Sequence, residues 1–240
     1  AAPFSNPNHF YHTARRIAEE DDNAWWANQF ENLSNAKAHF TGTGPEIFDQ
    51  LDGELDIFVS VAGTGGTLGG VTKFLKKQDQ NIKTISLDPD GSGIFHFLQT
   101  GEYKASVGGS FTEGIGIMRL VDNFRQANVD FALNLPDKDI VTVAEYVRKN
   151  DALVLGSSSA LNVAGALFSA IQFGPLSGGD KQSVVTLACD LGERSSSKLY
   201  NPEFLASKSI DPSEQSIEQL VEKYKNAKGS LKPVTHEFAE

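Results

Sequence analysis

Hydrophobic positions in the middle of the chain follow two alternating patterns. Residues 55–62 and 82–88 are short, mostly apolar runs, which predict buried strands. Between them, apolar side chains recur at helical spacing over residues 68–77. A strand, a helix and a second strand within about thirty residues are typical of the right-handed crossover unit of a parallel sheet.

The second half of the chain continues this alternation. Asp137 is expected to cap one helix, and residues 161–171 carry the inward-facing stripe of another. Apolar runs at 153–155 and 183–188 predict two more strands. The predicted fold class is therefore α/β, an open, mainly parallel sheet flanked by helices.

The carboxyl-terminal residues predict a helix and a tail outside this alternation. Asp211 and Glu214 have the spacing of a helix start. One apolar face follows, made of Ile217, Leu220, Val221 and Tyr224. That face needs a partner, from the same chain or from a second copy. From Gly229 onward we expect an extended tail.

Composition and charge exclude several classes of function. Thirty-one acidic residues against twenty-one basic ones give a formal net charge of −10, which argues against a nucleic-acid partner. The five histidines and the single cysteine have no metal-ligand spacing, so no metal site is expected. No apolar run has the length of a membrane span. Cys189 ends an apolar run and is expected to be inert core.

The most informative segment is the sequence GTGGTLGG at residues 63–70, between a predicted strand and a predicted helix. Glycines there allow a sharp turn and bring backbone N–H groups close to a ligand. The positive end of the following helix points to the same place and favours a phosphate. Thr64 and Thr67 add hydroxyl donors, and the absence of a lysine excludes a nucleoside-triphosphate loop.

Two alternatives for this loop fit its residues less well. A plain tight turn needs fewer glycines than the five present here. A dinucleotide fingerprint would use Asp88 at the end of the next strand, but Leu68 occupies the place of its third glycine. Asp88 is therefore interpreted as a strand-end residue. Phosphate binding is the prediction from the loop alone, and the rest of the ligand stays open.

The loop resembles the phosphate loop of the fold-type II pyridoxal 5'-phosphate (PLP) enzymes, the cysteine synthases and cystathionine β-synthases. Other segments of the same family agree in the same order over roughly the first 205 residues. They are Gln29–Asn32 with Gly42–Glu46, Glu113–Gly116, Gly156–Ser159 and Cys189–Arg194. Within the family, the chain is most similar to the fungal, mitochondrial-type cysteine synthase-like branch.

The resemblance implies a role for each matching residue. Ser158 would hydrogen-bond the pyridine nitrogen and leave it unprotonated, which favours β-replacement over transamination. The alternative for Ser158 is a plain helix cap. Gln29 would contact the substrate carboxylate, and Gly114 and Gly116 would leave room for the substrate. The phosphate would be held by Gly63, Thr64, Gly65, Gly66 and Thr67.

The family's Schiff-base lysine has no counterpart in this sequence, so no catalytic residue is assigned. None of the lysines here stands in the family's serine-x-lysine-aspartate-arginine context. We expect a carboxy-terminal fragment that functions with its own N-terminal segment. Residues 1–24 would end the small domain, 25–206 would form the large PLP-binding domain, and 207–240 a carboxyl-terminal helix and tail. A homodimer is implied by the resemblance.

The resemblance implies an enzyme that makes L-cysteine from O-acetylserine, or serine, and sulfide through an aminoacrylate intermediate. A cystathionine β-synthase and a cysteine desulfhydrase remain open, because they share that intermediate. A protein that keeps the PLP pocket but has lost the chemistry is the alternative outside enzymes. The resemblance also implies a mitochondrial or cytoplasmic location.

Overall fold

The central sheet has the strand order β4-β1-β2-β3-β5. The computed structural model describes residues 4–174, 182–227 and 229–236. Parallel pairing joins β4 to β1, β1 to β2 and β2 to β3, whereas β5 runs antiparallel to β3. The strands are β1 (Ile57–Val61), β2 (Lys83–Pro89), β3 (Phe131–Leu135), β4 (Val184–Val185) and β5 (Lys232–Pro233). The predicted α/β class with a mainly parallel sheet is confirmed.

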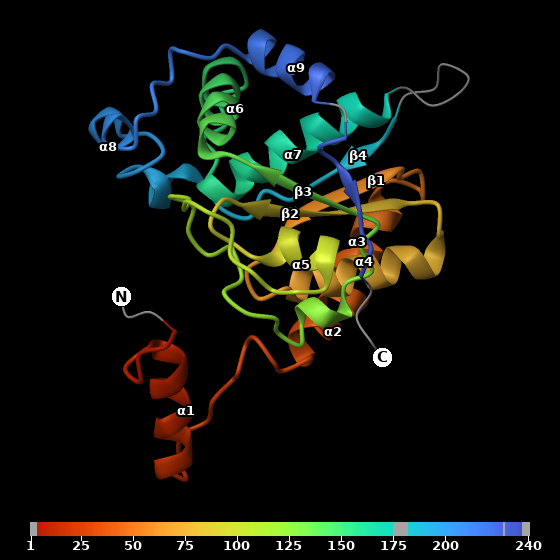
Figure 1. Cartoon of the computed structure of the whole chain (residues 1–240). Coiled ribbons are helices and arrows are strands. Elements are labelled where there is room, and N and C mark those ends of the chain that lie inside the picture. The colour runs from red at the N-terminus through yellow and green to blue at the C-terminus, as the bar shows by residue number, and fades with distance from the viewer. Residues whose placement is uncertain (1–3, 175–181, 228, 237–240) are drawn as a thin grey trace.

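Helices cover both faces of the sheet, so the body has three layers (Figure 1). One face carries α6 (Asp137–Asn150), α7 (Ser157–Phe173), α8 (Pro202–Ser207) and α9 (Ile217–Asn226). The other carries α2 (Ser34–Thr41), α3 (Thr43–Gln50), α4 (Gly66–Gln78), α5 (Ile94–Thr100) and the short η1 (Phe124–Gln126). In the described part of the chain, no helix is both long and apolar enough to span a membrane.

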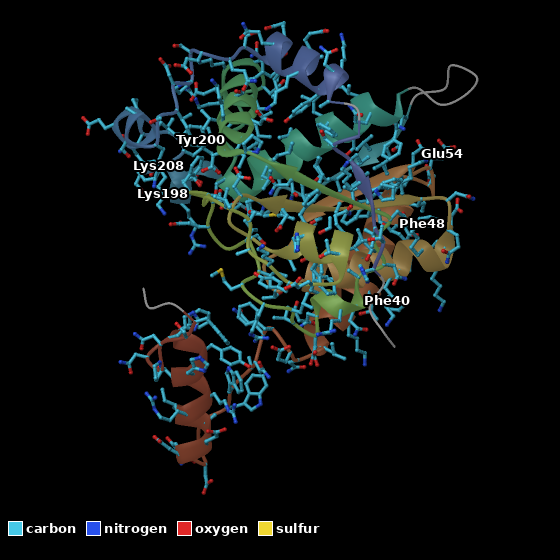
Figure 2. All side chains as sticks on the ribbon, viewed as in Figure 1. Phe40, Phe48, Glu54, Lys198, Tyr200 and Lys208 are labelled. Atoms are coloured by element: carbon cyan, nitrogen blue, oxygen red, sulfur yellow. The ribbon has the colours of Figure 1, made fainter. Side chains whose placement is uncertain are left out.

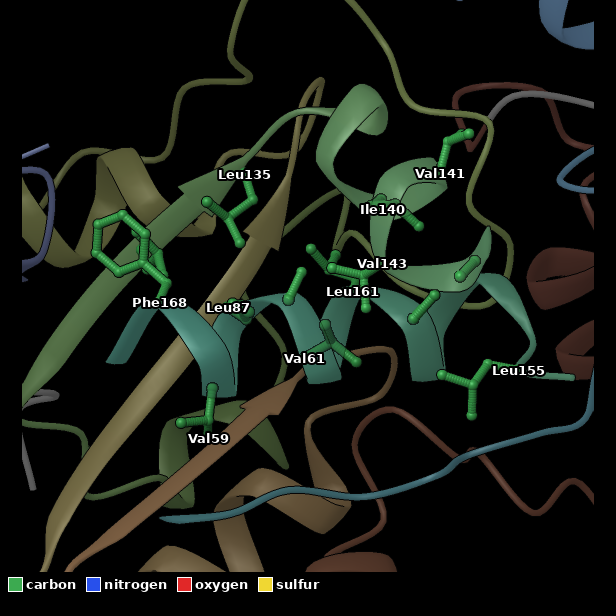
Figure 3. Close-up of a cluster of buried hydrophobic side chains, with 14 of the residues drawn as sticks. Val59, Val61, Leu87, Leu135, Ile140, Val141, Val143, Leu155, Leu161 and Phe168 are labelled. Atoms are coloured by element: carbon green, nitrogen blue, oxygen red, sulfur yellow. The ribbon is translucent and has the colours of Figure 1, made fainter. Parts of the chain in front are cut away.

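Alternate side chains of each strand divide the core into two clusters. Val59 and Val61 point into the α6–α7 side with Leu87 and Leu161, as Figure 3 shows. Phe58 points the other way and packs with the α4 side. On that side Phe40 and Phe48, labelled in Figure 2, both pack edge-on against Phe74, at ring-centroid distances of 5.9 and 6.2 Å. The central strands β1, β2 and β3 are thus largely buried on both faces, as expected for a parallel sheet.

Helix α1 (Phe10–Glu20) lies away from this body in Figure 1. Its contacts run through aromatic rings and one guanidinium. Arg119 from the body lies over the rings of Phe4, Tyr11 and Phe30, at 5.1, 5.1 and 5.9 Å. The predicted boundary near residue 24 stays a prediction, and residues 1–3 and 237–240 of the predicted end segments lie outside the described residues.

Two predicted helix starts are wrong. Asp137 does not cap α6, because it is the first helical residue and its carboxylate accepts hydrogen bonds from Phe111 N, at 2.9 Å, and from the Ser110 hydroxyl. The last helix begins at Ile217 rather than near Asp211. Ser216 and Gln219 form its capping box, whereas Asp211 closes a local turn with Ser213.

Three other predictions need correction. Residues 153–155 form no strand, and only Leu155 makes an isolated bridge to Leu191. The strand predicted at 183–188 is limited to β4 and is half-buried at the sheet edge. Part of the predicted extended tail is β5, which pairs with β3. The apolar face of α9 finds its partner in the same chain, since Leu220 and Tyr224 are buried against the α6–α7 side.

Candidate functional site

A cavity of about 950 Å³ opens at the carboxyl end of the sheet. Strand β1 runs into it, and both α4 and α7 begin at its wall. Parallel strands and the helices that follow them place loops and helix N-termini at this edge, where open α/β sheets bind ligands. Two helix N-termini therefore face one cavity, and their partial positive charge favours an anion.

The glycine loop forms one wall. Gly63, Thr64, Gly65 and Thr67 line the cavity, whereas Gly66 lies behind the loop against Asn35. Gly65 has a φ of +83°, and a Cβ there would lie 2.5 Å from the backbone of Phe124. Glycine is therefore required for both the turn and the close approach.

The turn at Gly114 and Gly116 packs directly on this loop. A Cβ on Gly63 would lie 2.2 Å from the carbonyl oxygen of Gly114. Gly114 itself lines the cavity, and a Cβ there would meet no atom within 4 Å. The missing side chain thus leaves open space inside the site. Gly116 faces a neighbouring cavity of about 410 Å³.

Gln29 also lines this second cavity and not the first. The two cavities share Gly63, Thr64 and Gly114 in their walls. The structure therefore brings the predicted phosphate residues and the predicted substrate residue to adjoining spaces on either side of the same loop.

Ser158 lines the large cavity opposite the glycine loop. It is the second residue of α7 and does not cap it, because the N-cap position is Gly156, so the helix-cap alternative is wrong. Its hydroxyl is 3.1 Å from Oδ1 of Asp190. The same carboxylate oxygen lies 3.1 Å from the Ser159 hydroxyl, and Asp190 packs so closely on Gly156 that a Cβ there would overlap it.

His39 is a wall residue for which the sequence offered no partner. Its ring nitrogens lie 2.9 Å from the Thr43 hydroxyl and 3.2 Å from the Thr67 hydroxyl. Burial lowers the pKa of His39, so the ring is neutral at pH 7. A neutral imidazole has one donor and one acceptor nitrogen, which suits two hydroxyl neighbours.

Cys189 is not part of the core, contrary to the prediction. It is exposed and lines the cavity, with its sulfur 3.4 Å from Nδ2 of Asn162. Partial desolvation, followed by the charge of Asp190, raises the pKa of the thiol. A protonated thiol is a weak nucleophile, so the position lines the site without being activated.

Comparisons with known proteins agree with this geometry. Residues 5–190 match the sequence family described as pyridoxal-phosphate dependent enzyme. The chain belongs to this family. Cysteine synthase 2 of Schizosaccharomyces pombe is 40% identical over 240 aligned residues, covering 92% of this chain. The chain spans 60% of the length of that relative.

Solved structures of fold-type II members resemble the chain as well. An O-acetylserine sulfhydrylase, isoform 3, from Entamoeba histolytica has a TM-score of 0.69 and 28% identity over 88% of this chain and 58% of its own. An O-acetylserine dependent cystathionine β-synthase from Helicobacter pylori has a TM-score of 0.66 and 29% identity over 77% and 56%. Both are members of the group that the sequence resembles.

The residues present fit the cofactor of this family. The start of α4 and the hydroxyls of Thr64 and Thr67 form a donor set suited to a phosphate. Open space at Gly114 and the polar wall at Ser158 suit a flat heteroaromatic ring. Among the described residues, no lysine lines the cavity.

Proposed function

We propose that this chain forms the PLP-binding part of an enzyme that makes L-cysteine from O-acetylserine and sulfide by β-replacement. The observation that carries the proposal is the pairing of the glycine loop with the start of α7 across one cavity. The identity to a cysteine synthase over nearly the whole chain supports the same reaction. When bound, PLP acts as an electron sink for chemistry at the amino acid's α- and β-carbons.

In this proposal, residues of this chain bind the cofactor and orient the amino-acid substrate. The N–H groups at the start of α4, with Thr64 and Thr67, would hold the phosphate, and neutral His39 would keep the Thr67 hydroxyl in place. Ser158 would donate its hydroxyl hydrogen to the ring nitrogen from the opposite wall, in place of the bond to Asp190 that it makes here. Gln29, in the adjoining cavity, would contact the carboxylate of the amino acid.

The Schiff-base lysine is proposed to come from an N-terminal segment of the protein that is not among these residues. Proton transfer and imine exchange need an amine within bonding reach of the cofactor aldehyde. Residues 1–240 supplied with PLP should therefore form no cysteine from O-acetylserine and sulfide. The full-length protein should form it, and comparable turnover by residues 1–240 alone would overturn this assignment of the lysine.

A cystathionine β-synthase is the second candidate, because a solved structure with that activity shares the fold at a TM-score of 0.66. The two reactions differ in the nucleophile. Sulfide and homocysteine, each offered to the full-length protein with O-acetylserine, separate them by product. Faster consumption of homocysteine than of sulfide would favour this candidate.

A homodimer and a mitochondrial or cytoplasmic location stay proposals that rest on the resemblance. The apolar face of α9 gives no support for a dimer, because it is buried against other helices of the same chain. Leu153, Val154 and Leu191 remain exposed and are apolar surface that a second copy would cover. Light scattering of the full-length protein at micromolar concentration measures its mass, and a monomer would contradict the proposal.

A further inference from the structure

The side chain of Asn35 lines neither cavity. It is hydrogen-bonded to Gln29, which lines the smaller cavity, and to Thr64, which lines both. Asn35 is the second residue of α2, and its Nδ2 donates to the carbonyl oxygen of Gln29 and to Oγ1 of Thr64, both at 2.9 Å. A carbonyl oxygen only accepts hydrogen bonds, so the bond to Gln29 fixes which end of the amide is nitrogen. Both hydrogens of the NH₂ group are thereby used.

The bond from Asn35 decides what the Thr64 hydroxyl is able to do. Oγ1 of Thr64 also accepts from the backbone N–H of Gly66, at 3.3 Å. A hydroxyl has two acceptor lone pairs and one hydrogen. With both lone pairs engaged inside the protein, the hydrogen is left for a partner in the cavity that Thr64 lines. Asn35 therefore turns Thr64 into a donor, as a phosphate oxygen requires.

The packing around Asn35 holds its amide in this place. A Cβ on Gly66 would lie 2.0 Å from Oδ1 of Asn35, so the glycine makes room for the amide. The carbonyl of Gln29 receives a further bond from Nδ2 of Asn123, at 3.1 Å. The side chain of Asn123 is fully buried and also bonds to the carbonyl oxygens of Phe30 and Asn32. The segment that carries Gln29 is thus fixed to α2 and to the loop before η1.

We propose that Asn35 is a positioning residue. Its amide links the Thr64 hydroxyl, which would bind the phosphate, to the backbone of the substrate segment at Gln29. One amide then sets both the affinity for the cofactor phosphate and the place from which Gln29 reaches the substrate. The inference rests on the proposed function for the roles of Thr64 and Gln29.

The first test measures cofactor affinity with and without the phosphate. In the full-length protein, Asn35→Ala should weaken PLP binding by roughly fivefold to tenfold, the effect of about one hydrogen bond. Binding of pyridoxal, which lacks the phosphate, should change less than twofold. Asn81→Ala is the matched control, because its exposed side chain donates to Asp79 in the turn before β2 and lines neither cavity. Equal losses for PLP and pyridoxal, or no loss for either, would overturn the proposal.

A double-variant cycle separates coupling from general loosening. Thr64→Val removes the hydroxyl, so Asn35→Ala should have no further effect on PLP affinity in that background. If the alanine variant does not fold, Asn35→Leu keeps roughly the side-chain volume and removes both donors without adding a charge, and the same selective loss for PLP is expected. An additive effect of the two substitutions would contradict coupling through Thr64.

Steady-state kinetics test the second half of the proposal, the effect of Asn35 on substrate binding. At saturating PLP, Asn35→Ala should raise the KM for O-acetylserine about fivefold and change kcat less than twofold, because the Gln29 segment loses one of its fixed points. An unchanged KM would overturn the substrate half. A wild-type protein that binds PLP but makes no cysteine would refute the proposed function and leave the affinity comparison standing, so the two failures are distinguishable.

Discussion

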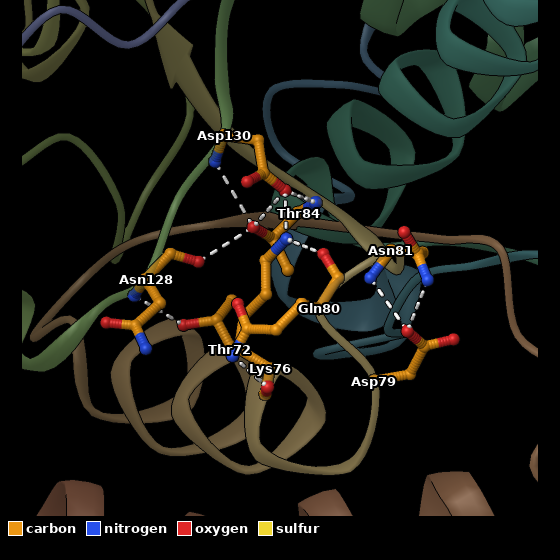
Figure 4. A network of polar contacts seen from close by, with 8 residues as sticks. All are labelled: Thr72, Lys76, Asp79, Gln80, Asn81, Thr84, Asn128 and Asp130. Carbon is orange, nitrogen blue, oxygen red and sulfur yellow. Dashed lines mark hydrogen bonds and ion pairs between the residues drawn. The ribbon is translucent and has the colours of Figure 1, made fainter.

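The two ends of the central sheet use polar side chains in opposite ways. At the amino end, Lys76 from α4 pairs with Oδ2 of Asp130 at 2.7 Å (Figure 4). Thr84 donates its backbone N–H to the same oxygen at 2.8 Å, and its hydroxyl oxygen lies 3.0 Å from it. Asn128 closes the network through its backbone, accepting from Thr84 and donating to Thr72. These contacts all lie within the protein.

At the carboxyl end, the corresponding groups open onto a cavity. The hydroxyls of Thr64, Thr67 and Ser158 line it, and positive-φ glycines bring backbone close to the space. The same α4 helix contributes to both ends, with its N-terminus at the cavity and Lys76 at the closed network. The difference indicates that one end of the helix is fixed for stability so that the other is held ready for a ligand.

The largest expected effect is at Gly65. Gly65→Val places a β-branched residue at a φ of +83° and its Cβ 2.5 Å from the backbone of Phe124, so the loop must move. PLP absorbance of the full-length protein should be lost. Gly108→Val is the control, because Gly108 also has a positive φ, of +102°, but open space around it. Unchanged cofactor content in the Gly65 variant would contradict the assignment of the loop.

At the amino end, Lys76→Met should lower the free energy of unfolding by roughly 2 kcal/mol, because it leaves the partly exposed Asp130 without its ion pair. PLP affinity per folded molecule should not change. Lys77→Met, one residue on and exposed, is expected to stay within about 0.5 kcal/mol of wild type. Urea unfolding measures the first quantity and cofactor titration the second. A loss of PLP affinity at unchanged stability would contradict this, because Lys76 would then serve the cavity and not the stability of the fold.

The pH dependence of stability tests the burial of Asp88, which lies at the carboxyl end of β2. Burial, with a smaller contribution from the charge of Asp90, raises the pKa of Asp88 to about 6, and the hydrogen bond from Phe95 N only partly opposes this. The folded state therefore holds this proton more tightly than the unfolded state. Its contribution to stability is complete below about pH 4 and is lost as the pH rises to about 6.

Asp88→Asn should remove that slope, which is at most about 1.4 kcal/mol per pH unit for one proton. Chemical denaturation at several pH values between 4 and 7 measures it. Asp79→Asn, at the exposed start of the turn before β2, should leave the slope in place. Parallel pH profiles for wild type and Asp88→Asn would rule out the raised pKa.

The smallest expected change in stability is at Ser158. Ser158→Ala removes one hydrogen bond to Asp190, worth about 1 kcal/mol of unfolding free energy. An energy of about 1 kcal/mol corresponds to a change of about fivefold. Cysteine formation by the full-length protein should fall further than this, because the hydroxyl is proposed to bind the cofactor ring. Melting temperature and turnover are compared directly. If they fall in proportion, Ser158 serves only the fold.

Local patterns predicted β1, β2 and the glycine loop, because their signals lie within a few consecutive residues. They missed β3 and gave a strand at 153–155 that does not form. β1, α4 and β2 are close to the segments expected from the apolar runs. The helix starts at Asp137 and Asp211 were wrong, since an aspartate caps a helix only if its carboxylate is not used elsewhere, and both carboxylates are.

The contacts that organise the site were outside the reach of sequence patterns. Asn35 is 29 residues from Thr64, His39 is 28 from Thr67, and Asp190 is 32 from Ser158. Each pair is brought together by helices packing at the sheet edge, and no periodicity within one segment encodes such a meeting. The exposure of Cys189 was missed for the same reason, because an apolar run does not show where its strand ends.

A structure of the full-length protein crystallised with PLP tests the central claim most directly. We expect the phosphate within hydrogen-bond distance of the Thr64 hydroxyl and of the backbone N–H groups at the start of α4, with the ring extending past Gly114 toward Ser158. A phosphate bound away from residues 63–67, or a cofactor that leaves this cavity empty, would contradict it.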